Sequence, residues 1–281
     1  MKYLTFTILL FCVLTAVAQE HFKIYSTSRQ KLISVDEIVN DMKKADVLFF
    51  GEEHDDSIAH VLEQTLLTGL YEKYPQHTAL SMEMFETDCQ LVLDEYLQGL
   101  IREKNLISDA RAWPNYKDYR PLIEYAKTQH LHVIAANAPA RYVNMVNRLG
   151  LQSLEQLSTA AKSHLPPLPI DTAEGAYYEK FIKIMGGHGS MPGMQLYQAQ
   201  NLWDATMAWS IASFYKAHKG FKILQINGGF HSEDKLGAAA QLKKYAPAVR
   251  ILNIALYSNE NSDNPDWSKY GKENDYIIVT N

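Results

Sequence analysis

The sequence predicts an α/β protein: a mostly parallel sheet flanked by helices on both faces, with a small inserted helical subdomain. Three observations support this fold class. Short apolar runs alternate with segments of helical periodicity, which is the pattern of βαβ units. The runs are apolar almost throughout, as strands covered on both faces are. Their uneven separation leaves room for an insertion, and 281 residues with 47% hydrophobic composition suffice for one large domain.

Six short runs are predicted as strands because they are rich in β-branched, aromatic and other apolar residues. They cover residues 46–50, 78–84, 132–136, 222–226, 250–256 and 276–280. A helix is predicted over residues 57–73, where apolar side chains recur on one stripe. A second long helix is predicted over residues 194–217.

The stretch between the third and fourth predicted strands is longer than one crossover helix needs. It contains two amphipathic segments, 149–161 and 173–185, on either side of a proline-rich breaker at residues 165–169. We interpret residues 140–193 as a helical subdomain inserted in a sheet domain that covers residues 19–281.

The first 18 residues have the features of a secretory signal peptide. Lys2 gives the charged start, residues 4–17 are apolar, and residues 16–18 form an A-x-A cleavage site. Cys12 raises the alternative of a lipoprotein, but the bulky Phe11 stands where a small residue is usual. We therefore expect an exported protein, periplasmic or secreted, without a lipid anchor and without a transmembrane segment in the mature chain.

The charge argues against nucleic-acid binding, and the cysteine content excludes an intramolecular disulfide. The formal charge of −5 falls to about −6 once Lys2 is removed, a mild acidity that argues against nucleic-acid binding. Cys89 is then the remaining cysteine of the two in the chain, so no intramolecular disulfide can form. We expect Cys89 to be buried and structural.

Two copies of Gly-x-x-His each follow a predicted strand directly. They are Gly51-Glu52-Glu53-His54 and Gly228-Gly229-Phe230-His231. With 14 Gly and 10 His in the chain, about 0.5 matches are expected by chance, so their position is more informative than their number. Ligands of open α/β sheets bind outside the carboxyl ends of the strands. We therefore expect His54 and His231 to share one site.

Polar residues also end the other strands. Glu83 lies between two methionines, Glu86 follows it, Asn137 ends the third run and Asn227 ends the fourth. A carboxylate in an apolar strand is costly to bury without a partner, and one of the two histidines would supply it. The convergence of four strand ends favours a functional site.

Two chemistries fit these residues. His54, Glu53, Glu83 and His231 could bind a divalent metal ion and leave positions open for water. Alternatively, His54, Glu83 and His231 could activate water as a metal-free acid–base group. The structural alternative is a polar network that closes the edge of the sheet.

Other side chains have weaker signals. Asp204 shares a helix face with Gln200 and could orient a site histidine, or could be a solvated carboxylate. Arg120 could pair with an acidic ligand or form a surface ion pair. His188 lies in a glycine-rich loop that could reach a ligand.

In chain order, these motifs resemble the ChaN-like haem-binding uptake family of the Tiki/erythromycin-esterase superfamily. The resemblance covers residues 30–257. It is carried by Gly51-Glu52-Glu53-His54-Asp55, Met82-Glu83, Asn137-Ala138-Pro139, Ala199-Gln200, Asp204-Ala205-Thr206-Met207-Ala208 and Asn227-Gly228-Gly229-Phe230-His231. It implies a large parallel sheet with a small helical domain.

Characterised members of that family are exported lipoproteins that bind two cofacial haems between two monomers. The resemblance therefore implies haem as the cofactor and a homodimer formed on haem binding. A tyrosine ligates each iron, and a His and a Lys of the other monomer reach the propionates. The implied haem-binding residues here are Tyr178, Tyr197, Lys183 and His188, and tyrosine ligation of haem iron is chemically reasonable.

Other members of the superfamily are hydrolases, some with a metal and some without. They use the two Gly-x-x-His histidines and a strand-end glutamate, which here are His54, Glu83 and His231. The resemblance thus leaves two functions open: a haem-binding protein of iron or haem uptake, and an esterase-like or peptidase-like hydrolase.

Overall fold

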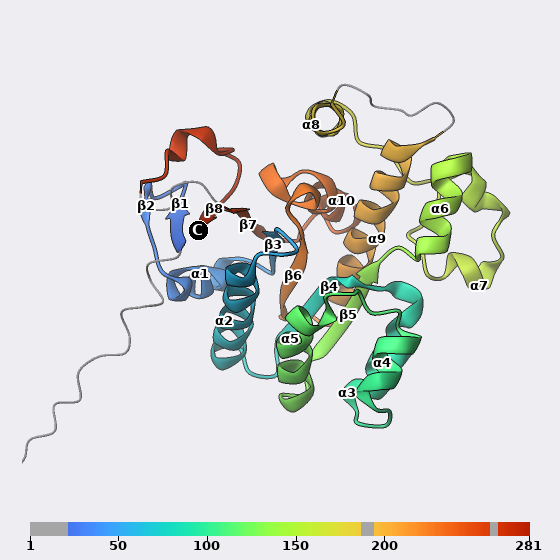
Figure 1. Cartoon of the computed structure of the whole chain (residues 1–281), viewed down its shortest axis with the longest axis horizontal. Coiled ribbons are helices and arrows are strands. Elements are labelled where there is room, and N and C mark those ends of the chain that lie inside the picture. The colour runs from blue at the N-terminus through green and yellow to red at the C-terminus, as the bar shows by residue number, and fades with distance from the viewer. Residues whose placement is uncertain (1–21, 187–193, 259–263) are drawn as a thin grey trace, which may run out of the picture.

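An eight-stranded sheet forms the centre of the computed structural model, which describes residues 22–186, 194–258 and 264–281 (Figure 1). The strand order is β2-β1-β8-β7-β3-β6-β4-β5. The strands are β1 (Phe22–Ser26), β2 (Lys31–Leu32), β3 (Val47–Glu52), β4 (Thr78–Glu86), β5 (His132–Asn137), β6 (Lys222–Gly228), β7 (Ile251–Ser258) and β8 (Tyr276–Thr280). The run from β8 to β5 is parallel, while β1 is antiparallel to both of its neighbours. The predicted mostly parallel sheet is confirmed, and all six predicted strands are present.

The strands β1 and β2 were not predicted. β2 has only two residues, both exposed, so it carries no apolar pattern. β1 is half-buried and lies near the edge of the sheet, where mixed polar and apolar residues are normal.

Helices cover both faces of the sheet, as predicted. The α-helices are α1 (Val35–Asp41), α2 (Ser57–Lys73), α3 (Gln90–Leu97), α4 (Glu103–Asp109), α5 (Tyr116–Thr128), α6 (Ala140–Leu149), α7 (Thr159–Lys162), α8 (Ala176–Ile184), α9 (Leu196–Ala217) and α10 (Gly237–Tyr245). Short 3-10 helices are η1 (Met42–Lys44), η2 (Thr87–Cys89), η3 (Leu151–Gln156), η4 (Gly229–His231), η5 (Glu233–Lys235) and η6 (Trp267–Lys269). None of the described helices is both long enough and apolar enough to span a bilayer.

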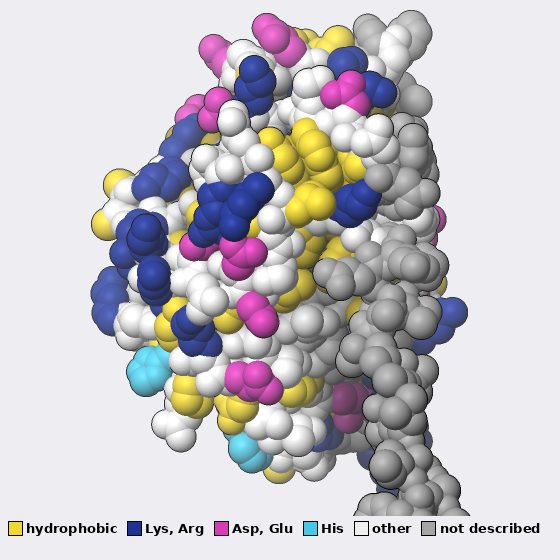
Figure 2. Space-filling model, turned by 90° about the vertical axis from the view of Figure 1, so that its left-hand side faces the viewer, with side chains coloured by type: hydrophobic (Ala, Val, Ile, Leu, Met, Phe, Trp, Pro, Cys, Tyr) yellow, Lys and Arg dark blue, Asp and Glu magenta, His cyan; other side chains and the backbone are white. Residues whose placement is uncertain are grey.

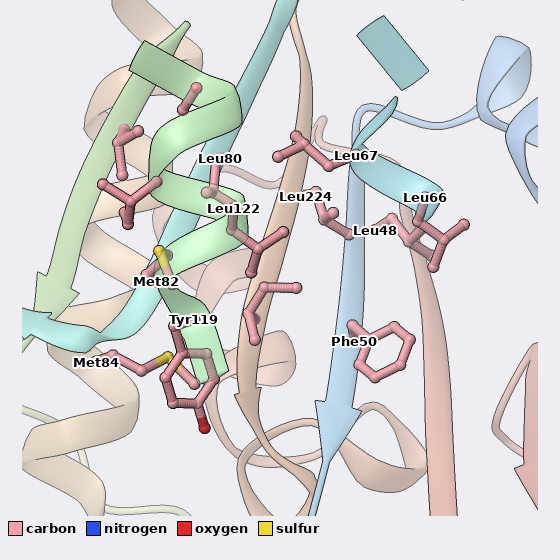
Figure 3. Packing of buried hydrophobic residues seen from close by; sticks show 14 of the residues in the cluster. Leu48, Phe50, Leu66, Leu67, Leu80, Met82, Met84, Tyr119, Leu122 and Leu224 are labelled. Atoms are coloured by element: carbon pink, nitrogen blue, oxygen red, sulfur yellow. The ribbon is translucent and has the colours of Figure 1, made fainter. Parts of the chain in front are cut away.

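The period-two alternation of β3 divides the core into two layers. Leu48 and Phe50 belong to the cluster formed with α1 to α5, whereas Val47 and Phe49 belong to the cluster formed with α9 and α10. Figure 3 shows the first layer, in which the Tyr119 hydroxyl of α5 points toward the carboxyl end of β3. A polar group on an otherwise apolar helix face therefore reaches the edge of the sheet where ligands bind.

The helical segment after β5 packs on the N-terminal half of α9. Val146 of α6, Leu154 of η3 and Leu202 of α9 are fully buried in one separate cluster. The amphipathic segment 149–161 is not one α-helix: its first residue, Leu149, ends α6, Gly150 with φ of 78° follows, and the segment continues as the 3-10 helix η3 and the start of α7. The structure describes the predicted insertion, residues 140–193, up to residue 186, and residues 187–193 lie outside those described.

The surface shown in Figure 2 carries charges of both signs, with Asp and Glu side chains between the Lys and Arg side chains. Apolar side chains gather in one patch in the upper part of this face. Smaller groups of apolar side chains lie near the lower end of this face.

Candidate functional site

The two Gly-x-x-His motifs meet because β3 and β6 are neighbours in the sheet. They pair in parallel register, with Gly51 opposite Asn227 and Glu52 opposite Gly228. Both motifs therefore leave the sheet at the same level. The strand β4 lies on the other side of β6, which brings Glu83 to the same edge.

Glu83 lies beside both motifs. Its Oε2 accepts a hydrogen bond from the Gly228 amide at 2.8 Å, and its Oε1 lies 3.6 Å from His231 Nε2. A Cβ atom at Gly228 would lie only 2.8 Å from His54 Nε2, so the glycine of the second motif leaves the space for the histidine of the first. The structure thus brings together His54, Glu83 and His231.

A buried network fixes the orientation of His231. Its Nδ1 lies 2.7 Å from Asp204 Oδ1, and the Tyr177 hydroxyl donates to Asp204 Oδ2 at 2.5 Å. Gln200 donates to the Tyr177 oxygen at 3.1 Å. Asp204 is fully buried and takes the position predicted for the partner of a site histidine. Its bond to Nδ1 leaves Nε2 of His231 to face Glu83.

His231 is a proton donor rather than a base at neutral pH. Burial alone lowers its pKa, but the nearby carboxylates of Glu83 and Asp204 outweigh burial and raise the pKa to about 9. The imidazolium can therefore donate a proton to a leaving group or hold an anion such as a carboxylate.

A second carboxylate orients His54. Glu52 Oε1 lies 2.9 Å from His54 Nδ1 and accepts a hydrogen bond from the Tyr119 hydroxyl at 2.8 Å. Burial lowers the His54 pKa, but the hydrogen bond to Glu52 and the charge of Glu83 raise it overall. The sequence motifs did not predict this role for Glu52. Side chains alternate along a strand, so Glu52 lies on the same face of β3 as Phe50, two residues earlier. That alternation is the signal that places Glu52 beside α5.

Glu53 points away from the histidines, in agreement with that alternation. Its Oε1 accepts a hydrogen bond from the Ser258 amide at 3.0 Å, and its Oε2 accepts one from the Ser258 hydroxyl. The structure therefore does not bring Glu53 together with His54, Glu83 and His231 in the predicted metal set. The remaining three side chains offer two imidazole nitrogens and one carboxylate, which by type suit a divalent metal, but they do not form a group of described residues whose ligand atoms all lie within 4.8 Å of one another.

The helix α8 lies at the same end of the sheet as these side chains (Figure 1). Tyr177 of α8 contacts Phe230 of the second motif, with ring centroids 5.1 Å apart. A cavity of about 240 Å³ lies between Ile184 at the end of α8, Phe230 and the end of β3. A ligand could therefore approach the strand ends beneath α8.

The predicted haem-binding residues have different environments. Tyr178 on α8 is 46% exposed, while the Tyr197 hydroxyl donates to the carbonyl oxygen of Ala173. Their rings are 5.0 Å apart, and both line a cavity of about 460 Å³. Lys183 is exposed on α8, and His188 lies outside the described residues.

The remaining candidates fit their structural alternatives. Arg120 pairs with Glu103 on the surface, with 2.5 Å between Nε and Oε1. Cys89 is buried, and burial raises the pKa of its thiol to about 12. Asn137 Oδ1 accepts a hydrogen bond from the Ala138 amide, and Asn227 donates to Ser232. These residues shape the edge of the sheet.

Comparison with known proteins identifies a family model that matches most of the chain. The family model described as "Haem-binding uptake, Tiki superfamily, ChaN" matches residues 38–242, which is more than half of the chain. No curated protein sequence matches the chain.

The chain shares its fold with a solved structure. The structure titled "Cofacial heme binding to ChaN of Campylobacter jejuni" is 18% identical, with a TM-score of 0.69 over 94% of this chain and 98% of that chain. The type III effector HopBA1 (12% identity, 88% of this chain and 92% of that chain, TM-score 0.46) is less similar. So is a Bacillus cereus protein (14% identity, 84% and 76%, TM-score 0.46).

Proposed function

Because the chain belongs to the haem-binding uptake family of the Tiki superfamily that includes ChaN, we propose that it binds haem and acts in haem or iron uptake. The observation that carries this proposal is the family match over residues 38–242, which contains both Gly-x-x-His motifs and the whole of α8. The fold shared with ChaN of Campylobacter jejuni supports it.

Tyr178 is our candidate for the iron ligand. The hydroxyl of its neighbour Tyr177 is committed to Asp204, and that of Tyr197 is committed to Ala173. Tyr178 is the most exposed of these three tyrosines and lines a cavity. A phenolate ligand stabilises ferric haem, and Lys183 on the same helix and His188 are the candidates for contact with propionates.

The apolar surface near Tyr178 supports a shared haem pocket. Ile184 at the end of α8 is 64% exposed, and Met194, which precedes α9 and lines the same cavity as Tyr178, is 37% exposed. Exposed apolar groups gathered in this way mark interaction surfaces. A cofacial haem pair between two copies would cover them through a two-fold interface.

Hemin titration of the purified protein tests the proposal. We expect saturable binding with the spectrum of tyrosinate-ligated iron, a loss of that spectrum in Tyr178→Phe, and a shift from monomer to dimer in light scattering. Tyr215→Phe, the same change near the other end of α9, is the matched control and should bind normally. Absence of saturable binding in the unmodified protein would refute the proposal.

Export is the second part of the proposal and rests on the leader at residues 1–18. Sequencing the N-terminus of protein recovered from the periplasm or medium should show a start at residue 19. Recovery of uncleaved chain from the cytoplasm alone would contradict it.

Hydrolysis is a second candidate function, favoured by the histidine–carboxylate pairs that face Glu83. In a metal-free reaction, Glu83 would accept a proton from water and the His231 imidazolium would donate one to the leaving group. In a metal-dependent reaction, His54, Glu83 and His231 would hold the ion, which would supply activated water. Turnover of p-nitrophenyl esters or peptides, abolished by His231→Ala, would support this function, and no turnover with or without added metal would refute it.

A further inference from the structure

A second set of metal-ligating side chains lies between β3 and α2. Glu52 comes from the end of β3, while His60 and Glu63 lie three residues apart on one face of α2. One ligand atom from each lies within 4.8 Å of the others. The Asp56 side chain fixes the start of α2 by accepting hydrogen bonds from the amides of Ile58 and Ala59, so the helix presents both residues in a defined position.

The distances in this cluster are long for hydrogen bonds between charged groups and fit the spacing of ligands around a metal ion. His60 Nδ1 lies 3.5 Å from Glu52 Oε2 and 3.4 Å from Glu63 Oε2. Hydrogen bonds between charged groups are shorter, about 2.7–2.9 Å. Ligand atoms about 2.1 Å from a tetrahedral ion are separated from one another by roughly 3.4 Å. The two measured distances therefore match two edges of a coordination polyhedron.

Unpartnered atoms point to the same place. Glu52 Oε1 is occupied by His54 and Tyr119, but no N–H or hydroxyl donor reaches Glu52 Oε2 or Glu63 Oε1, both of which are buried. The Glu52 and Glu63 side chains are completely buried, and the His60 side chain is 11% exposed. Two buried carboxylates facing each other need either a shared proton or a cation between them, and the imidazole of His60 beside them completes a ligand set for a divalent cation.

We propose that Glu52, His60 and Glu63 bind a divalent transition-metal ion. One imidazole and two carboxylates suit Zn²⁺ or Mn²⁺, whereas Mg²⁺ and Ca²⁺ prefer oxygen ligands alone. The ion would tie α2 to β3 and hold Glu52, which in turn orients His54. The site is separate from the haem residues on α8 and stands whether or not the protein binds haem.

Metal binding to the chelator-treated protein tests this site. The experiment is equilibrium dialysis against Zn²⁺, and separately Mn²⁺, with bound metal measured by mass spectrometry. We expect about one ion per chain in the unmodified protein. Loss of an outer-sphere partner of a ligand weakens metal affinity about 10- to 100-fold, so His60→Gln and Glu63→Gln should weaken it at least that much. A rise in melting temperature on adding metal should also disappear in both variants.

Two control variants distinguish this site from the cluster of His54, Glu83 and His231 and from surface binding. His231→Ala removes a ligand of that other cluster, and His130→Gln makes the same change at an exposed histidine. Both should keep the ion. Metal lost in His231→Ala but kept in His60→Gln would overturn the proposal, as would an unmodified protein that binds no metal.

The main alternative to a metal ion is a proton shared between Glu52 and Glu63. In that case the amide of Glu63→Gln would replace the proton, the melting temperature would not fall, and neither metal would bind. That result overturns the proposal. Hemin titration of the same variants distinguishes failure of this site from failure of haem binding.

Discussion

The site contains the same three-part arrangement twice, once on each face of the sheet. His54 is held by Glu52, which accepts from Tyr119 of α5. His231 is held by Asp204, which accepts from Tyr177 of α8. The environments differ: the His54 side chain is 41% exposed, whereas that of His231 is 10% exposed.

This difference assigns different roles to two equivalent motifs. The buried His231 has the carboxylates of Glu83 and Asp204 at close range. It behaves as a fixed cation, because little water competes for its charge. The half-exposed His54 is open to a ligand from solvent. The carboxylate that orients it, Glu52, has its other oxygen in the buried cluster with His60. One histidine is therefore part of the core, and the other is part of the surface of the site.

Removing the carboxylate on the buried side should have the largest effect on stability. Asp204→Ala removes the buried partner of both His231 Nδ1 and the Tyr177 hydroxyl and leaves Glu83 as the remaining carboxylate beside His231, so we expect a loss of about 3–5 kcal/mol of unfolding free energy. Urea denaturation followed by circular dichroism measures it. Asp171→Ala, at a side chain that is 75% exposed, should change the free energy by less than about 0.5 kcal/mol. Equal losses of unfolding free energy in Asp204→Ala and Asp171→Ala would contradict a special role of the buried carboxylate.

The pH dependence of stability should come mainly from His231. Its pKa rises on folding from about 6.5 to about 9, so the folded state binds this proton more tightly than the unfolded chain. The resulting stabilisation is complete below pH 6.5 and declines as pH rises through 9, by about 3 kcal/mol in all. His231→Gln should flatten that decline in urea titrations between pH 6 and 10. A decline of the same size in the variant would assign it to other groups.

The spacing between the two motifs gives a third, smaller effect. Gly228→Ala would place a methyl group against His54 Nε2, so we expect a loss of about 1–3 kcal/mol and a displaced His54 ring. At Gly229 the nearest atom to an added Cβ lies at 3.5 Å, an ordinary contact. Gly229→Ala is therefore the matched control and should be tolerated. If both variants melt like the unmodified protein, Gly228 does not set the position of His54.

The smallest effect on stability should come from His54 itself. His54→Gln removes a half-exposed partner of Glu52, worth about 0.2–1 kcal/mol because solvent screens such pairs. Ligand affinity or turnover should fall although the melting temperature barely changes. A large loss of stability would show that the two histidines have the same structural role.

Much of the fold follows from the sequence because the buried strands carry their own apolar pattern. The residues 46–50 and 222–226 are recognisable as strands without any knowledge of their neighbours. The pairing of His231 with Asp204 was partly predictable, since the α9 face was identified from helical spacing. The role of Tyr119 was not, because nothing in a helix sequence indicates which strand end its hydroxyl will reach.

The choice between Glu52 and Glu53 was the main gap in the predicted site. Both follow the same strand, and the alternation of side chains decides which one enters the network. Alternation fixes the face of the sheet, but only the positions of α5 and β7 determine that Tyr119 meets Glu52 and Ser258 meets Glu53. Tertiary packing therefore determines which of the two glutamates orients His54.

The strand order has a consequence for when the site can exist. β3 is translated early, yet both of its neighbours in the sheet, β6 and β7, are among the last three strands made. The contacts that close the site therefore span most of the chain, and such long-range contacts form slowly because the loop must first be closed. A chain that stops before Lys222 contains His54. It lacks Gly228, which leaves space for the His54 ring, and it lacks His231, the second histidine of the site. Any ligand that binds between the two motifs consequently binds only a chain that has paired β6 with β3, and binding would stabilise that pairing.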